Sequence, residues 1–405
     1  MNQNETYTTY RDILRGQRLP LAFVDLDHFD ANVGYIAGLA QAAGKTIRLG
    51  TKSIRCVDLL RRIFAAAPEV FQGLLTFTVE ETAWLASQGF DDMIVAYPSV
   101  QPTDIDRMVE MTRAGKKVWL MVDNLDHLRY LSEAGETAGL RLHACLEVDM
   151  AFHPFNLTGV HLGVRRSPVR TPEQALELVK AAKSLQGVCL DALMGYEGHI
   201  AGMSDAVPGA GLKNAIMRAV KGSSVRELTA RRDKVVAALR AEGADLRIIN
   251  GGGSGSIIST GKDPLVTEIT VGSGFYASGL FHHYQEVCFT PSAFFAIQIV
   301  RFPAPGMITC LGGGYVASGA VGVEKLPLPM FPAGLKYIDL EAAGEVQTPF
   351  ILPENCPTLA LGDPIILQHA KAGELCERFN DLLLLQNGDL IGNVKTYRGD
   401  GMAFL

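Results

Sequence analysis

The stretch Ile47-Arg48-Leu49-Gly50-Thr51-Lys52-Ser53 decides the fold, because a short apolar run ends there and is followed at once by a lysine. The run from Thr46 to Leu49 is predicted to form a buried strand, with Lys52 just past its end. Similar runs recur as far as Gly279, separated by longer amphipathic stretches. This alternation is typical of repeated strand–helix units around a parallel sheet.

Eight strands in strict alternation with helices favour a (β/α)8 barrel over a doubly wound sheet. The predicted barrel strands are Ile47–Gly50, Leu74–Thr78, Asp92–Tyr97, Val118–Asp123, Leu142–Asp149, Leu190–Tyr196, Leu246–Asn250 and Glu268–Val271. The predicted helices are Cys56–Ala66, Val79–Gln88, Pro102–Ala114, Leu125–Ala138, Thr171–Leu185 and Ser224–Glu242.

After Gly279 the helical periodicity disappears, and strand-like runs alternate with Gly/Pro turns. A chain of 405 residues exceeds the size of one core, so a second domain is expected. We predict a barrel over residues 27–280 and a β domain over residues 1–26 and 281–405, with strand Leu21–Leu26 in the β domain. Its other strands are predicted at Ser292–Phe302, Gly306–Leu311, Glu345–Leu352, Pro364–Gln368, Asp381–Gln386 and Asp389–Tyr397.

Composition is that of a globular protein, with 48% hydrophobic and 20% charged residues. A net charge of −6 and the lack of a Lys/Arg stripe argue against nucleic-acid binding. Residues 1–18 have no apolar core of a signal peptide, and no apolar run is long enough to span a membrane. Seven cysteines without a CxxC pair fit reduced thiols, so we expect a cytoplasmic protein.

Two glycine-rich segments favour a catalytic role for Lys52. A partly desolvated lysine at a strand end favours the neutral amine, which can hold an aldehyde cofactor as a Schiff base. Gly251–Ser256 follows the seventh predicted strand and Gly272–Tyr276 follows the eighth. In barrel enzymes the loops after these strands commonly bind phosphate through backbone N–H groups.

Interpretations without this cofactor chemistry stay open for Lys52 and the two glycine-rich segments. Most lysines are solvated, and glycine-rich loops can be tight turns without a ligand. As a Rossmann fingerprint Gly251–Ser256 lacks the third glycine, and no helix is expected over the β-branched run Ile257–Gly261. A sugar-phosphate barrel enzyme, or a non-catalytic protein that binds a phosphorylated cofactor, would use the same loops.

Three polar clusters could carry chemistry. Gly195–His199 brings Tyr196 and His199 to the end of the sixth predicted strand, as an acid/base cluster or a polar turn. Arg165, in the loop after the fifth strand, could clamp a carboxylate or tune a cofactor ring, although loop arginines are usually solvated. In the β domain, imidazole, carboxylate and thiolate suit Mn²⁺ or Zn²⁺ unless the segment is an ordinary loop. These predicted ligands are His369, Glu374 and Cys376.

Taken together, the segments resemble the D-threonine aldolase and D-serine dehydratase family, within the alanine-racemase-like (fold type III) pyridoxal phosphate enzymes. The resemblance runs in order over nearly the whole chain, and several blocks in register make it specific. The matching blocks are Leu21–Asp27 with Asn32, Ile47–Lys52, Asp92–Pro98, Glu147–Asp149, Gly195–His199, Gly251–Ser256, Gly272–Tyr276 and Asn387–Gly399.

By this resemblance Lys52 would hold pyridoxal 5'-phosphate, Arg165 would lie near its ring, and His199 would lie near the substrate. Tyr196 is predicted both to contact the cofactor and to take part in catalysis. A divalent metal (Mn²⁺, Mg²⁺ or Zn²⁺) would lie beside the substrate hydroxyl, but Glu374 stands at a position where the family has histidine. The phosphate would contact Gly252, Gly253, Ser254, Gly255, Gly274, Phe275 and Tyr276.

The resemblance implies a lyase that cleaves a D-β-hydroxy-α-amino acid such as D-threonine to glycine and an aldehyde, with metal assistance. The alternative on the same cofactor is dehydration of a D-3-hydroxy amino acid, as in D-serine dehydratase. Racemisation ranks third, because the lysine segment of alanine racemases is absent. The expected partners are a small D-amino acid substrate and a second copy in a homodimer.

Overall fold

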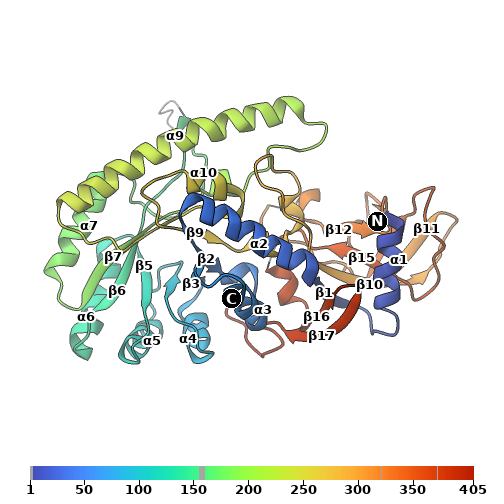
Figure 1. Cartoon of the computed structure of the whole chain (residues 1–405), viewed down its shortest axis with the longest axis horizontal. Coiled ribbons are helices and arrows are strands. Elements are labelled where there is room, and N and C mark those ends of the chain that lie inside the picture. The colour runs from blue at the N-terminus through green and yellow to red at the C-terminus, as the bar shows by residue number, and fades with distance from the viewer. Residues whose placement is uncertain (1–2, 155–159, 321, 372) are drawn as a thin grey trace.

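The computed structural model describes residues 3–154, 160–320, 322–371 and 373–405. It consists of a closed barrel of eight parallel strands and a separate nine-stranded, mostly antiparallel sheet (Figure 1). The predicted (β/α)8 barrel with a β domain is therefore confirmed.

The barrel strands fall at all eight predicted places. Each is short and apolar, and the ring closes where Thr46 pairs with Glu268 in parallel register. In order they are β2 (Thr46–Gly50), β3 (Phe71–Thr76), β4 (Met93–Val95), β5 (Val118–Val122), β6 (Leu142–Glu147), β7 (Val188–Gly195), β8 (Ile248–Gly251) and β9 (Glu268–Val271).

All six predicted barrel helices are present, and side-chain caps at Thr78, Asn124 and Thr171 begin three of them. The capping box that begins at Thr171 stabilises the first turn of its helix by bonding two otherwise unpaired N–H groups. The helices are α3 (Val57–Ala66), α4 (Val79–Ser87), α5 (Pro102–Arg113), α6 (Leu125–Ala138), α7 (Pro172–Ser184) and α9 (Gly211–Ala241).

Two helical segments differ from the prediction. Helix α9 begins at Gly211 rather than Ser224, and its first turns carry exposed Leu212 and Ile216, so they lack an amphipathic pattern. The run Ile257–Gly261 forms a short helix, α10, where none was expected. This helix is one turn long, so it does not restore a dinucleotide fingerprint.

The β domain takes its central strand from the start of the chain. Strand β1 (Leu21–Asp25) pairs antiparallel with β10 and parallel with β16. Helix α2 (Leu26–Ala43), which was not predicted, then leads into the barrel (Figure 1). The other strands are β10 (Ala293–Arg301), β11 (Met307–Leu311), β12 (Leu328–Phe331), β13 (Lys336–Tyr337), β14 (Gln347–Ile351), β15 (Pro364–Gln368), β16 (Asp381–Gln386) and β17 (Asp389–Lys395).

Inside the barrel lies a charged cluster centred on Arg48, which is 1% exposed. Its guanidinium donates to Glu268 at 2.6 and 2.9 Å and to the Asp92 carboxylate at 2.7 Å. Asn250 donates to the same Glu268 at 2.7 Å and exchanges hydrogen bonds with Thr270. Because each buried charge is paired, the cluster avoids the penalty of an isolated charge and fixes the orientation of Asn250 and Thr270.

Candidate functional site

Lys52 lies in a short 3-10 turn, Thr51–Ser53, directly after β2. The turn is fixed on both sides: the Thr51 hydroxyl donates to the Leu75 carbonyl at 3.1 Å, and Gly373 packs against the Lys52 backbone. Gly373 has φ +88°, and a Cβ there would lie 1.9 Å from the Lys52 carbonyl oxygen. Glycine is therefore required for the β domain to approach Lys52 this closely.

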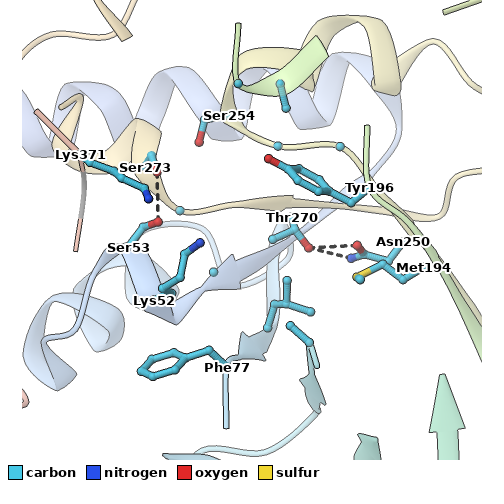
Figure 2. A pocket seen from close by; sticks show the side chains of 18 of the residues that line it. Lys52, Ser53, Phe77, Met194, Tyr196, Asn250, Ser254, Thr270, Ser273 and Lys371 are labelled. Atoms are coloured by element: carbon cyan, nitrogen blue, oxygen red, sulfur yellow. Dashed lines mark hydrogen bonds between the residues drawn. The ribbon is translucent and has the colours of Figure 1, made fainter. Parts of the chain in front are cut away.

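The Lys52 side chain enters a cavity of about 240 Å³ at the carboxyl ends of the barrel strands. In Figure 2, Lys52, Ser254, Tyr196 and Lys371 surround one space. Barrel enzymes place their active sites at this rim. The lining residues are Gly50, Lys52, Ser53, Leu75, Thr76, Phe77, Ala96, Tyr97, Arg166, Met194, Tyr196, Ala201, Gly202, Asn250, Gly252, Gly253, Ser254, Thr270, Gly272, Ser273, Ser278, Leu280, Phe281 and Lys371.

The surroundings of Lys52 lower the pKa of its amine. Solvent reaches the side chain through the cavity, but the surrounding protein still desolvates the ammonium, and this lowers the pKa of Lys52. Repulsion by the cations Arg166 and Arg55 lowers the pKa further, against a smaller opposing effect of Glu374. A larger fraction of unprotonated amine makes Lys52 a better nucleophile than a surface lysine.

Both glycine-rich loops reach the cavity. Ser254 begins the 3-10 turn Ser254–Ser256, and Ser273 begins the short helix α11 (Ser273–Tyr276). Within the described chain, the backbone N–H groups of Ser254 and Ser273 have no protein acceptor. The Ser273 hydroxyl also lies 3.0 Å from that of Ser53, next to Lys52. Free N–H groups and hydroxyls of this kind suit an anion such as phosphate.

A buried ion triad holds the first glycine loop in place. Glu197 accepts the Gly252 N–H at 2.6 Å, and its other oxygen pairs with Arg232 of α9. Arg232 also donates to Asp263 at 2.5 Å, and none of the three side chains is more than 4% exposed. The loop therefore depends on an arginine that sequence reasoning did not single out.

Arg166, rather than the predicted Arg165, lines the cavity. Its guanidinium lies 5.2 Å from the ring centres of both Tyr97 and Tyr196 and 3.7 Å from Glu147. Burial raises the pKa of Glu147 to about 7, and the charge of Arg166 opposes this rise. Two aromatic faces hold the cation at the cavity wall, where it can bind a carboxylate.

Of the predicted cofactor contacts, Lys52, Tyr196, Gly252, Gly253 and Ser254 line the cavity. Burial raises the pKa of Tyr196, so its hydroxyl stays protonated and can donate a hydrogen bond. The other predicted phosphate contacts are buried and do not line the cavity: Gly255, Gly274, Phe275 and Tyr276.

Tyr276 supports the site from outside the cavity. Its fully buried hydroxyl donates to the Ile54 carbonyl at 2.8 Å, next to the turn that carries Lys52. The predicted catalytic His199 also lies outside the cavity lining. Its Nε2 pairs with the Ser224 hydroxyl, and burial, followed by the charge of Arg231, lowers the pKa of His199 to about 4. The role of His199 near the substrate therefore stays a prediction, although its side chain does not line the cavity.

The three predicted metal ligands do not converge in the described chain. The Cys376 thiol is fully buried and donates to the Ile54 carbonyl at 3.3 Å, and burial raises its pKa to about 12. Glu374 accepts the Ser318 N–H at 3.0 Å. The His369 ring is buried and packs edge-on against Tyr276. Within the described residues, one set of side chains meets the geometry of a metal site: His143, Cys189 and Asp191.

Sequence reasoning missed several cavity residues. Ser53 adjoins Lys52 and could have been chosen from that position, Asn250 ends one predicted strand, and Thr270 is the last but one residue of another. Lys371 and Phe281 reach the cavity from beyond the barrel, and no local pattern marks them.

All seven cysteines are free thiols in the structure. No helix in the described part of the chain is long and apolar enough to cross a membrane.

Curated relatives resemble this chain over part of their length. The 3-hydroxy-D-aspartate aldolase of Paracoccus denitrificans (strain Pd 1222) is 25% identical over 254 residues, covering 63% of this chain and 59% of that protein. The match thus spans less than two thirds of this relative. A D-threonine aldolase of Arthrobacter sp is 23% identical over 292 residues, covering 71% of this chain and 70% of the relative.

Solved structures share the fold. The crystal structure of D-threonine aldolase from Filomicrobium marinum gives a TM-score of 0.79 at 18% identity, covering 96% of each chain. The D-threo-3-hydroxyaspartate dehydratase from Delftia sp. HT23 gives 0.72 at 16% identity, covering 95% of this chain and 98% of the other. The family model "Alanine racemase, N-terminal domain" matches residues 24–278, which is more than half of the chain. The resemblance inferred from the sequence is thus confirmed, and the chain belongs to the alanine racemase N-terminal domain family of pyridoxal phosphate enzymes.

Proposed function

We propose that this protein is a pyridoxal-phosphate-dependent carbon–carbon lyase that cleaves a D-β-hydroxy-α-amino acid to glycine and an aldehyde. The observation that carries the proposal is the position of Lys52: a lysine with a lowered pKa shares one cavity with the free N–H groups of Ser254 and Ser273. Names of the curated relatives support an aldolase over the other reactions of the family.

The cavity fits the cofactor by the chemistry of its donors. When bound, pyridoxal phosphate supplies an aldehyde for covalent attachment and a ring that accepts the electrons released by bond cleavage. Lys52 would supply the amine, while Ser254 and Ser273 would bind the phosphate through their N–H groups. Tyr196 and Arg166, which also line the cavity, would contact the ring and the substrate.

Substrate binding is assigned to the cations of the cavity. Among the described lining residues there is no Asp or Glu, whereas Lys52, Arg166 and Lys371 all reach the cavity. Arg166 can bind the α-carboxylate of an amino acid. Burial lowers the pKa of Lys371, the charge of Glu374 opposes this lowering, and the charge of Lys52 adds to it, so the Lys371 amine lies within reach of both a cation and an anion. Phe77 and Phe281 make part of the wall apolar and exclude water.

The surplus of cations favours a substrate with a second carboxylate. The names of the relatives include both a D-threonine and a 3-hydroxy-D-aspartate aldolase. Lys371 hydrogen-bonds the Ser318 hydroxyl at 2.8 Å and lies 3.9 Å from Glu374, so the cation is only partly neutralised. We therefore propose that a D-3-hydroxyaspartate-type acid is cleaved with a higher kcat/KM than D-threonine, and that Lys371→Gln reduces this preference.

Borohydride reduction tests the attachment of the cofactor. The protein is loaded with pyridoxal phosphate, its ultraviolet–visible spectrum is recorded, and the reduced adduct is mapped by mass spectrometry. We expect the adduct on Lys52 and its loss in Lys52→Arg, whereas Lys371→Gln, in the same cavity, keeps it. An adduct that maps to Lys371 would contradict the assignment, and a colourless protein would favour a sugar-phosphate enzyme.

Product analysis tests the reaction. Glycine and an aldehyde in equal amounts from D-substrates, but not from L-substrates, are expected. Ammonia with a 2-oxo acid and no glycine would instead select the dehydratase, and deuterium uptake at Cα without cleavage would select a racemase. Bound cofactor without turnover of any D-amino acid would indicate a non-catalytic binding protein.

Three further expectations remain proposals. Metal assistance predicts that a chelator lowers activity and that Mn²⁺, Mg²⁺ or Zn²⁺ restores it; unchanged activity in the chelator would exclude this role. A homodimer predicts twice the chain mass in sedimentation, and a cytoplasmic location predicts recovery in the cytosolic fraction. His369, Glu374 and Cys376 are not carried forward as the ligands of an assisting metal, because their side chains do not converge.

A further inference from the structure

A second polar cluster lies at the opposite end of the barrel from Lys52, where strands β6 and β7 begin. His143 is the second residue of β6, and Cys189, its partner in the parallel register, is the second residue of β7. Asp191 follows two residues later. There the register shifts, because Ala144 pairs with Leu190 while the next residue of β6 pairs with Ala192. The bulge leaves Asp191 without a cross-strand partner and places its carboxylate beside the other two side chains.

We propose that His143, Cys189 and Asp191 form a divalent-metal site that takes Zn²⁺. Their nitrogen, sulfur and oxygen atoms all lie within 4.8 Å of one another. Zinc binds these donor types at about 2.0–2.3 Å, which separates neighbouring ligands by roughly 3–4 Å, so small side-chain adjustments suffice. A thiolate beside an imidazole favours zinc over Mg²⁺ or Ca²⁺, which bind oxygen ligands.

The Asp191 carboxylate is oriented for this role by a residue of β5. Trp119 donates its indole N–H to Oδ1 of Asp191 at 2.7 Å, while Oδ2 lies 2.9 Å from Nδ1 of His143. A hydrogen bond of this kind from outside a metal site fixes the ligand and tunes its basicity. One oxygen of Asp191 is thus held by Trp119, and the other faces the histidine.

The site also has access and room. The three side chains line a cavity of about 380 Å³ that is open to solvent, so a metal can enter and water can supply the fourth ligand. Arg247 competes with a metal for Asp191, with Nη1 3.4 Å from Oδ2, and Arg141 and Lys183 also line this cavity. The Arg247 side chain is 53% exposed and can turn into solvent when a metal displaces it. The metal would link β6 to β7 at the base of the barrel, away from the catalytic rim.

Cobalt substitution provides the test, because a Co²⁺–thiolate bond has a charge-transfer band that carboxylate or imidazole ligation lacks. The full chain is titrated with Co²⁺ and followed by difference spectroscopy, so that absorption by any cofactor cancels. Zn²⁺ is then titrated in competition. We expect one equivalent of Co²⁺ with a thiolate band, displaced by one equivalent of Zn²⁺.

Variants assign the band. Cys189→Ser is expected to abolish the thiolate band and to weaken Zn²⁺ binding at least about tenfold. Asp191→Asn is expected to weaken Zn²⁺ binding by a similar factor. Cys145→Ser, on the same strand as His143, and Cys376→Ser are expected to keep the band, and circular dichroism confirms that each variant is folded. A band lost with Cys376 instead, or no binding at micromolar metal, would overturn the proposal. Lys52→Ala should bind Zn²⁺ like the wild type, so this proposal can fail or succeed independently of the lyase activity.

Discussion

Arg232 offers the sharpest test of how the cofactor loop is held. Its guanidinium joins Glu197, which accepts the Gly252 N–H, to Asp263, and all three side chains are at most 4% exposed. Methionine at this position keeps the length and apolar contacts of the side chain but removes its charge. Arg232→Met therefore leaves two buried carboxylates without their cation.

The cost follows from this geometry. Removing one partner of a buried pair costs about 3–5 kcal/mol, because the other charge stays buried and unpaired. The Arg232 bond to the Gly195 carbonyl at 3.2 Å is lost as well. We expect Arg232→Met to lower the free energy of unfolding by about 3–5 kcal/mol and to weaken cofactor binding, because Glu197 no longer has a fixed orientation toward Gly252.

Urea unfolding, followed by circular dichroism and tryptophan fluorescence, measures the first effect, and titration with pyridoxal phosphate measures the second. The matched control is Lys234→Met on the same helix, whose exposed side chain should change stability by no more than about 0.5 kcal/mol. In the triple variant Arg232→Met, Glu197→Gln, Asp263→Asn no charge is left unpaired, and we expect at least half of the lost stability to return. The reasoning is refuted if Arg232→Met costs less than about 1 kcal/mol, or if the triple variant is no more stable than Arg232→Met.

Two further predictions concern single positions. Gly373→Ala should lower the free energy of unfolding by about 1–3 kcal/mol more than Gly388→Ala, because both glycines have positive φ but only Gly373 meets a backbone oxygen. Gly373→Ala should also reduce cofactor attachment at Lys52. Equal unfolding midpoints of the two variants would contradict this reasoning. For His199 the folded pKa of about 4 lies below its unfolded value, so the unfolded chain binds the extra proton as the pH falls and stability is lost from about pH 6.5 downward. Between pH 7 and pH 5 this loss is about 2 kcal/mol, and His199→Gln should remove it from the free energy of unfolding measured in urea. If the free energy of unfolding of the variant depends on pH as in the wild type, His199 is protonated or exposed in the folded protein.

The barrel could be predicted because its information is local. Each strand is a short run of branched and leucine side chains bounded by turn residues, and the spacing of eight such runs permits few alternatives. The first turns of α9 were missed because exposed Leu212 and Ile216 break the amphipathic pattern there. The position of Lys52 followed from the end of its strand alone.

The site was harder to predict where it depends on irregular or distant chain. Arg165 and Arg166 are neighbours in a loop without periodicity, so no rule says which one turns toward Tyr97 and Tyr196. Lys371 reaches the cavity only because the β domain packs on the barrel rim. His369, Glu374 and Cys376 form a cluster of residue types in the sequence, but such a cluster does not show which side chains face one another.

Strand β1 places a constraint on how the chain can be synthesised and divided. Leu382 of β16 pairs with Ala22 of β1, so the middle of one sheet joins the two ends of the polypeptide. While the ribosome is still translating the barrel, β1 has neither of its neighbours, and its hydrogen-bonding edges stay open. A fragment that begins after residue 280 would lack the strand between β10 and β16. The segment before the barrel therefore completes the sheet of the second domain, and a fragment without it would leave the facing edges of β10 and β16 unpaired.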